Sequence, residues 1–235
     1  WKQTAAEYQA LYYQGFNMAR LRVEQALMNH SANDKPLAII SDLDETLLLA
    51  HDYWGYLINE DKDFFDDASW DEWVAEQRMM PSPGALDFLR FCAENRVEVF
   101  YVTNRDQGES TFKLALQSLQ QLEFPYADEA HLSVLRDTSN KETVQNLIRG
   151  KYQVVVMLGD NLNDFSRKFY VTDVNERQAL MNSERERFGR DLIVFPNPTD
   201  GHWMRAIFGD SEPPPTAENR AILKAAASTR AWPAR

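Results

Sequence analysis

Cysteine is almost absent from this sequence: Cys92 is the only one among 235 residues, so no disulfide can form within the chain. A chain of this length buries enough surface to fold without such a cross-link. Basic residues are also scarce, since 25 Lys and Arg stand against 36 Asp and Glu, which gives a net charge of −11. This balance argues against a general nucleic-acid binder, whose affinity rests on Lys and Arg that neutralise phosphates.

Long apolar runs are missing as well. The longest strand-like run covers only residues 154–158, far short of the roughly 18 residues of a membrane-spanning helix. The composition is 44% hydrophobic and 26% charged, which excludes wholesale disorder. Because the sequence begins at Trp1 and not at Met, we expect a processed or trimmed product whose targeting segment lies outside it.

Strand-like and helix-like segments alternate along the chain, which predicts an α/β fold with a parallel sheet covered by helices. The predicted strands cover residues 37–41, 97–103, 153–158 and 192–195. The predicted helices cover residues 4–28, 84–95, 109–122 and about 175–187, with a short one that opens near Asn140. Thr4 and Glu7 have the spacing of a capping box at the start of the first helix.

Residues 50–83 differ from the rest because aromatic and acidic side chains are interleaved there. We interpret this stretch as a small cap inserted after the first strand. For most of its residues, however, a solvated acidic surface held by ordinary core aromatics is the simpler explanation. Residues 1–210 would then form one domain with an N-terminal helical segment, and residues 211–235 a C-terminal tail with a short helix and a frayed end.

Three predicted strands end in polar side chains. These ends are residues 42–46 (Asp-Leu-Asp-Glu-Thr), 103–105 (Thr-Asn-Arg) and 159–164 (Gly-Asp-Asn-Leu-Asn-Asp). Aspartate also caps helices and turns, so each segment alone has an ordinary structural explanation. In an open parallel sheet, however, the carboxyl ends of the strands share one edge, where ligands bind. The three segments together therefore predict one site.

The acidic residues of that site are Asp42, Asp44, Asp160 and Asp164. Four carboxylates at one sheet edge repel one another, and some would stay protonated unless a cation lay between them. Magnesium prefers oxygen ligands and often shares them with a substrate phosphate. The sequence therefore predicts a site for a hard divalent cation.

Thr103, Asn104 and Lys141 supply what a phosphate group needs, namely a hydroxyl, an amide and a positive charge. Lys141 lies at a predicted helix start, where free backbone N–H groups also favour an anion. Considered alone, Lys141 is more simply a solvated surface lysine. A role for Lys141 in phosphate binding is favoured only because the sequence also contains the three polar strand ends.

In this order, the segments resemble the haloacid dehalogenase (HAD) superfamily of aspartyl-phosphate enzymes. The resemblance is narrower still to the bacterial class C nonspecific acid phosphatases, also called the lipoprotein e family of 5′-nucleotidases, over roughly residues 1–205. The stretches that carry it are residues 1–16, 70–74, 83–85, 100–105, 159–165 and 195–197. It implies a HAD-like, Rossmann-like sheet and a magnesium-dependent phosphomonoesterase.

The resemblance also implies roles for the acidic residues. Asp42 would attack phosphorus to form an aspartyl-phosphate, and Asp44 would protonate the leaving alkoxide and later activate water. Magnesium would be held by Asp42, the backbone carbonyl of Asp44 and Asp160. Asp164 would orient Lys141 or a metal-bound water.

The substrate would be held from two sides. Thr103, Asn104 and Lys141 would bind the transferring phosphoryl group. Trp70 would form one wall of an aromatic slot for the leaving group. Asp200 stands where the family often has the tyrosine of the opposite wall, and His51 stands where a small polar residue is usual. These two departures put the nucleotide preference in doubt.

As partners we expect small-molecule phosphate monoesters and no nucleic acid. The resemblance implies an exported protein of the cell envelope, in the periplasm or at the outer membrane and often lipid-anchored, and it leaves a homodimer open. One alternative is a non-catalytic protein on the same fold, as among plant vegetative storage proteins. Others are a surface lipoprotein that binds an apolar ligand, and phosphoryl transfer to an alcohol acceptor.

Overall fold

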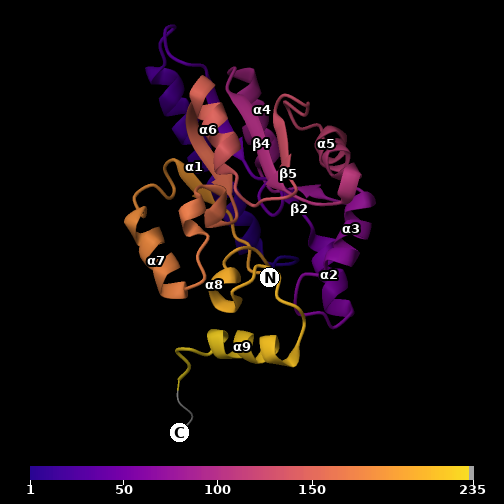
Figure 1. The fold of residues 1–235 in the computed structure, drawn as a ribbon. Helices are drawn as coiled ribbons and strands as arrows, with labels where there is room; N and C mark the ends of the chain where they lie inside the picture. Colours follow the sequence, from indigo (N-terminus) through magenta and orange to yellow (C-terminus); the bar gives the residue numbers. More distant parts are fainter. Residues whose placement is uncertain (233–235) are drawn as a thin grey trace.

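Five parallel strands form the centre of the fold in a computed structural model that describes residues 1–232 (Figure 1). Across the sheet they are β5 (Leu132–Leu135), β4 (Glu98–Asn104), β1 (Leu37–Ser41), β6 (Gln153–Gly159) and β7 (Leu192–Val194). All neighbouring strands run parallel. The predicted α/β fold is confirmed, and the four predicted strands lie within one residue of their expected bounds. The additional strand, β5, is short and only partly buried at the sheet edge.

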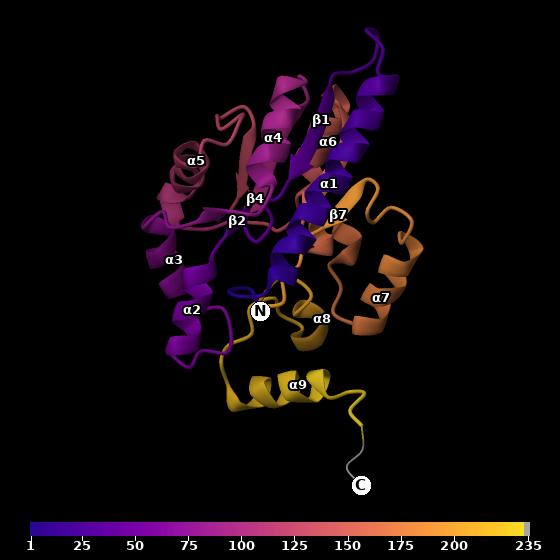
Figure 2. The same ribbon diagram turned by 180° about the vertical axis from the view of Figure 1, so that it is seen from behind.

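Helices cover both faces of this sheet. Successive strand residues point to opposite faces, so Ile39 belongs to one core cluster and Ile40 to another. The first cluster packs under α1 (Ala6–Asn29), α4 (Ala85–Glu94) and α5 (Thr111–Gln121), and the second under α6 (Glu142–Lys151). Figure 2 shows α1 and α4 in front of the strands. Because both faces are covered, β1 is buried at every position and is almost entirely apolar.

The segment between β1 and α4 leaves the sheet and forms a small substructure. It contains β2 (Leu48–Leu49), α2 (His51–Asn59), α3 (Asp67–Ala75) and β3 (Met80–Pro81). The β2 and β3 strands pair antiparallel and so bring the two ends of the segment together. Asp66 caps α3 by accepting a hydrogen bond from the backbone N–H of Ser69 at 3.0 Å. We refer to residues 50–79 as the cap.

Two local predictions are wrong. The capping box is absent, because α1 begins at Ala6 and its N-cap is Ala5, whose side chain has no polar atom. Thr4 lies in a preceding turn in which Ala5 N donates to Trp1 O. The helix expected over residues 175–187 is α7 (Val174–Ser183), which ends four residues earlier. Its extension is replaced by tight turns in which the Glu184 carboxylate is paired with Lys168 and Arg187.

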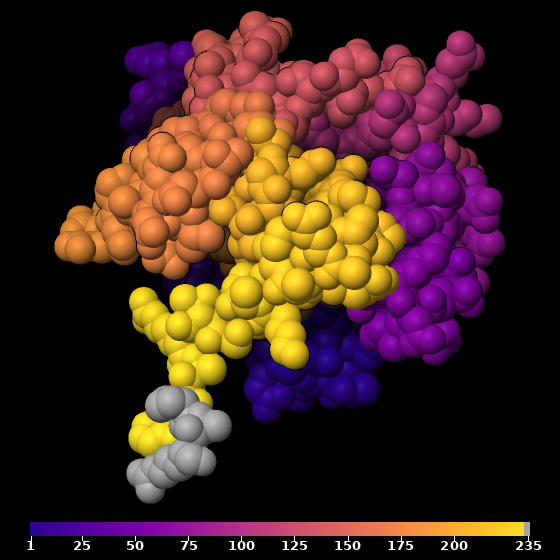
Figure 3. Space-filling model, turned by 60° about the horizontal axis from the view of Figure 1, so that its bottom comes forward, coloured from indigo at the N-terminus to yellow at the C-terminus, as the bar shows by residue number. Residues whose placement is uncertain are grey.

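The chain crosses the carboxyl edge of the sheet again after β6 and after β7. The short elements there are η2 (Leu162–Asp164), η3 (Arg167–Phe169), α8 (Arg205–Phe208) and α9 (Ala217–Ala227). In Figure 3 the segment after β7, in yellow, lies between α7 and the cap. An ion pair between Arg220 and Asp63 joins α9 to the cap. The end of the expected frayed tail, residues 233–235, is outside the described residues.

Among residues 1–232, no helix combines the length and the apolar character that crossing a membrane requires.

Candidate active site

The predicted site residues gather around one cavity at the carboxyl edge of the sheet. Strands β4 and β6 flank β1 on opposite sides, and such a reversal of strand order leaves a crevice where α/β proteins bind ligands. The cavity has a volume of about 600 Å³. All eight side chains to which a role at the site is assigned from the sequence line it: Asp42, Asp44, Trp70, Thr103, Asn104, Lys141, Asp160 and Asp164.

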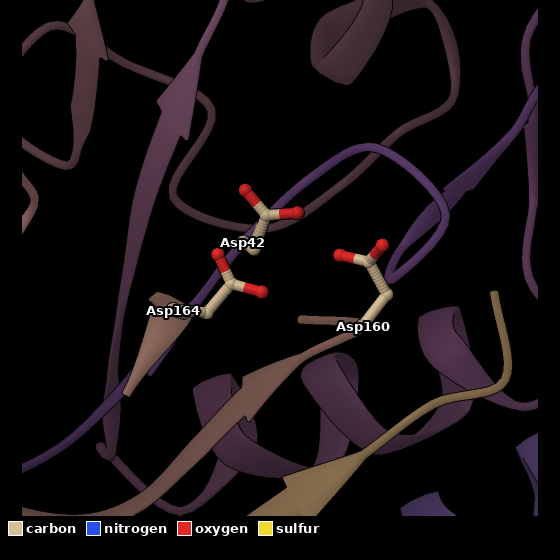
Figure 4. A group of neighbouring side chains, drawn as sticks. All are labelled: Asp42, Asp160 and Asp164. Carbon is tan, nitrogen blue, oxygen red and sulfur yellow. The ribbon is translucent and has the colours of Figure 1, made fainter. Parts of the chain in front are cut away.

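Three of the aspartates converge at the bottom of this site (Figure 4). One carboxylate oxygen from each of Asp42, Asp160 and Asp164 lies within 4.8 Å of the others. Burial raises the pKa of Asp42 to about 7; the charge of Lys141 opposes this shift, and the charge of Asp164 adds to it. Burial and the same carboxylate neighbours also raise the pKa of Asp160 well above its usual range. An all-oxygen donor set that resists ionisation in this way fits a hard divalent cation.

Lys141 lies between two of these carboxylates. Its Nζ donates to Asp42 Oδ1 at 2.5 Å and to Asp164 Oδ1 at 2.7 Å. Only 6% of Lys141 is exposed, so it is not a solvated surface lysine. Burial lowers its pKa, but the charges of Asp164 and Asp42 outweigh this effect and raise the pKa above that of a free lysine. Lys141 is therefore a fixed positive charge inside the cavity.

Asp164 is held on both carboxylate oxygens. Oδ1 accepts from Lys141, and Oδ2 accepts from the backbone N–H of Asn161 at 2.9 Å, within the turn that opens η2. The close approach of this side chain to β6 needs a glycine, because a Cβ at Gly159 would lie 2.5 Å from Asp164 Cβ. With both oxygens engaged, Asp164 is better placed to orient Lys141 than to bind a metal.

The side chain of Asp44 lies outside the cluster of three carboxylates and pairs with Arg105. Arg105 Nε donates to Asp44 Oδ2 at 2.7 Å, and Nη2 donates to Oδ1 at 2.6 Å. Such a bidentate pair fixes the plane of the carboxylate. The sequence places Arg105 at a strand end but assigns it no role, although its position next to Thr103 and Asn104 offers a signal. A metal contact through the Asp44 backbone carbonyl stays a prediction.

The two other candidate phosphate ligands end β4. Thr103 is buried and Asn104 is half-buried, and both line the cavity. Asn104 Nδ2 donates to Thr138 O at 2.6 Å, which ties the strand end to the loop that leads to Lys141. This bond fixes the amide beside the cavity.

The cap provides an aromatic wall. Trp70 reaches the cavity but is only 9% exposed, because its ring packs against Tyr53 and Trp73 with centroids 4.9 and 5.3 Å away. Phe65 and His202 also line the cavity, and the sequence gave no motif that pointed to either. Burial lowers the pKa of His202 to about 4, so its imidazole is uncharged at neutral pH.

The two departures from the family pattern lie in different places. Asp200 lines the cavity and accepts from Asn197 Nδ2 at 2.7 Å. Burial and the charge of Glu45 raise the pKa of Asp200 to about 6, although Lys2 opposes the shift. His51 begins α2, lies against Tyr8 with ring centroids 5.7 Å apart, and is not among the residues that line the cavity.

Comparison with known proteins agrees with this geometry. The family described as HAD superfamily, subfamily IIIB (Acid phosphatase) matches residues 1–203. Two solved structures of the class C acid phosphatase from Bacillus anthracis are similar to this chain. The one with tungstate bound is 27% identical, with a TM-score of 0.88, over 100% of this chain and 95% of that chain. The other is 29% identical, with a TM-score of 0.86, over 95% of this chain and 92% of that chain.

The matched region spans every residue discussed at the cavity from Asp42 to His202. The resemblance predicted from the sequence is thus confirmed. This chain belongs to the acid phosphatases of HAD superfamily subfamily IIIB, and it is a phosphoric monoester hydrolase.

Proposed function

We propose that this chain hydrolyses phosphate monoesters through an aspartyl-phosphate on Asp42, with Mg²⁺ as cofactor. The observation that carries the proposal is the placement of the Asp42 carboxylate. This carboxylate lies in the cavity directly after β1. Its Oδ1 accepts from the Lys141 ammonium at 2.5 Å, and a second carboxylate, that of Asp160, lies beside it. Thr46 Oγ lies 3.4 Å from an oxygen of each aspartate and so lies between them.

The residues present fit the metal. Asp42, Asp160 and the backbone carbonyl of Asp44 would hold Mg²⁺, and all three offer oxygen. When bound, the ion supplies positive charge that offsets the carboxylates and the phosphoryl oxygens. It would also keep Asp42 ionised at a pH below its metal-free pKa of about 7.

In the first step, an oxygen of Asp42 forms a bond to phosphorus while the bond from phosphorus to the leaving oxygen breaks. Lys141 and Thr103 donate hydrogen bonds to the phosphoryl oxygens as this happens. Asn104 can add its second N–H, because its first is held by Thr138 O at 2.6 Å. Asp44 gives its proton to the leaving alkoxide, which departs as an alcohol.

In the second step, Asp44 takes a proton from water, whose oxygen attacks phosphorus and releases Asp42 and phosphate. One residue thus acts as acid and then as base. Both oxygens of Asp44 accept from Arg105 in this structure, so the pair has to open at one oxygen before Asp44 carries a proton. The Arg105 pair also fixes the plane of the Asp44 carboxylate, which acts as the base in the second step.

Two further points support the proposal. The Bacillus anthracis enzyme has been solved with tungstate bound, and tungstate is an oxyanion like phosphate. The cap side of the cavity offers Phe65, Trp70 and the neutral His202, which suits an aromatic or apolar leaving group. We further propose that the protein works in the cell envelope, a location that rests on the sequence resemblance alone.

The test is turnover of p-nitrophenyl phosphate by the metal-free protein, with and without added Mg²⁺. We expect activity that depends on Mg²⁺ and is lost on chelation. Full activity after exhaustive chelation would contradict the metal requirement. Absence of turnover with Mg²⁺ and several divalent alternatives would favour a ligand-binding protein on the same fold.

A further inference from the structure

Lys2 is a buried lysine that the proposed chemistry does not use. It lies ahead of α1, and only 8% of it is exposed. Its Nζ lies 2.6 Å from Glu45 Oε2 and donates to Thr199 Oγ1 at 2.9 Å, and it also lies 4.8 Å from the ring centre of Trp54. A buried ammonium is costly unless it is paired, so this arrangement holds Lys2 in one place.

From Lys2 a chain of hydrogen bonds leads to the candidate metal site. Thr199 Oγ1 donates to Asn197 Oδ1 at 2.7 Å, and Asn197 Nδ2 donates to Asp160 Oδ2 at 2.7 Å. The direction of each bond is set by chemistry. An ammonium can only donate, so the Thr199 hydroxyl accepts from Lys2 and gives its single proton to Asn197.

This order fixes the amide of Asn197. Its oxygen faces Thr199, so its two N–H bonds face the carboxylates of Asp160 and Asp200, at 2.7 Å each. A reversed amide would place its oxygen against two carboxylates and leave them without these donors. The backbone N–H groups of Thr199 at 3.1 Å and of Asp200 at 3.4 Å also donate to Asn197 Oδ1, so the hydroxyl bond that Lys2 directs is one of three that hold the amide in this orientation.

A second branch runs from Lys2 into the loop after β1. Glu45 follows Asp44 directly, is 4% exposed and has a left-handed backbone with φ of 57°. Its carboxylate also accepts from Trp54 Nε1 at 2.8 Å, and its backbone carbonyl accepts from Tyr12 Oη at 2.5 Å. Lys2 therefore joins the loop that carries Asp42 and Asp44 to the loop that supports Asp160.

We propose that Lys2 is a positioning residue of the metal site: through Thr199 and Asn197 it orients the Asp160 carboxylate for Mg²⁺. This inference rests on the proposed function, since it assumes that Asp160 binds the ion. Residues that hydrogen-bond to a metal-binding side chain raise the affinity for the metal, because they hold that side chain in its binding orientation. Lys2 does not touch the substrate, so its effect should appear in metal affinity before it appears in the chemical step.

The test is Mg²⁺ binding to the metal-free protein by isothermal titration calorimetry, without substrate. Thr199→Val removes the hydroxyl and keeps the shape, whereas Thr199→Ser keeps the hydroxyl. We expect Thr199→Val to weaken Mg²⁺ binding about fivefold, below the roughly 10- to 100-fold cost of losing a direct partner, because Thr199 acts through Asn197. Thr199→Ser should stay within about twofold of the wild type.

Lys2→Met should weaken binding by at least as much as Thr199→Val. Its matched control is Lys113→Met, which removes one positive charge from an exposed position on α5. If Lys2→Met does not fold, the comparison of Thr199→Val with Thr199→Ser still tests the inference, since both variants leave the ion pair of Lys2 and Glu45 in place.

Equal Mg²⁺ affinity in wild type and Thr199→Val would overturn the inference. So would a loss in Lys113→Met as large as that in Lys2→Met, because net charge would then explain the effect. Wild-type protein that binds no Mg²⁺ would overturn the proposed function itself, which is a distinct result. Weakening in Thr199→Val and Lys2→Met, with Thr199→Ser and Lys113→Met unchanged, would support the inference.

Discussion

The two sides of the cavity are built in different ways. On the sheet side, the charged groups Asp42, Lys141 and Asp164 are each at most 8% exposed and are joined by bonds of 2.5 and 2.7 Å. On the cap side, Trp70 packs mainly within its own aromatic cluster, and acidic residues such as Asp71 line the opening. Charged groups held in place next to the reacting atoms can stabilise a transition state. The packed aromatic side chains and the more distant acidic residues of the cap act only on which substrates bind. Changes on the sheet side should therefore have the larger effects.

The largest expected effect is that of Asp42→Asn. The amide has nearly the same shape as the carboxylate but is a poor nucleophile towards phosphorus, so we expect kcat to fall by at least about 10⁴-fold. Circular dichroism and the thermal midpoint check that the variant is folded. A folded variant with activity close to that of the wild type would remove Asp42 from the role of nucleophile.

The next effect in size is that of Lys141→Ala, which removes the buried positive charge. Loss of such a donor costs about 2–4 kcal/mol in the transition state, hence roughly 30- to 1000-fold in kcat. Inhibition by phosphate should weaken in the same variant, because phosphate loses the same contact. Lys113→Ala on the surface serves as control, and a change in Lys141→Ala no larger than in this control would exclude a role in phosphate binding.

Arg105→Lys tests whether geometry matters as much as charge on the sheet side. Lysine keeps the positive charge but cannot make the two parallel bonds that fix Asp44, so we expect kcat to fall about 10- to 100-fold. The loss should be smaller for p-nitrophenyl phosphate than for glycerol phosphate in the first step, because p-nitrophenolate leaves without a proton. Equal kcat values for Arg105→Lys and wild type on both substrates would mean that the pair does not position Asp44.

The smallest expected effect is that of Asp200, which lies on the loop after β7, outside the cap, and lines the cavity. Its pKa is raised to about 6, so the carboxyl is largely charged at pH 7.5 and largely neutral at pH 5. A charged Asp200 repels a triphosphate more than a monophosphate, so the ratio of kcat/KM for AMP over ATP should fall as the pH drops through about 6. Asp200→Asn should lower this ratio about threefold at pH 7.5 and remove its dependence near pH 6, as expected for one partly exposed charge. An unchanged ratio in Asp200→Asn would show that the preference for monophosphates arises elsewhere.

The same contrast explains what the sequence could predict. Asp42 and Asp160 directly follow buried strands, and Thr103 lies at the end of another. Parallel strands bring such ends together whatever the details of packing. Lys141 has no such signal, because nothing in its own sequence neighbourhood shows that it is buried.

Other features had no local signal. The pair of Arg105 and Asp44 joins residues 61 positions apart, and the bond from Lys2 to Thr199 joins residues 197 positions apart. Such contacts depend on how loops cross the sheet edge, and no periodicity records them. The edge strand β5 was missed because three of its four residues are only partly buried, which leaves no continuous apolar run to find.

The most direct measurement is a burst and trapping experiment on Asp44→Asn with p-nitrophenyl phosphate. Because p-nitrophenolate needs no proton to leave, Asp42 should still be phosphorylated, while the intermediate lacks the base that activates water. We expect a burst of about one p-nitrophenolate per active site, and, after acid quench and digestion, a phosphoryl group on the peptide that contains Asp42. Asp42→Asn should show neither. A steady release without a burst and without a phosphorylated peptide, or a phosphoryl group on any other residue, would contradict the aspartyl-phosphate on Asp42.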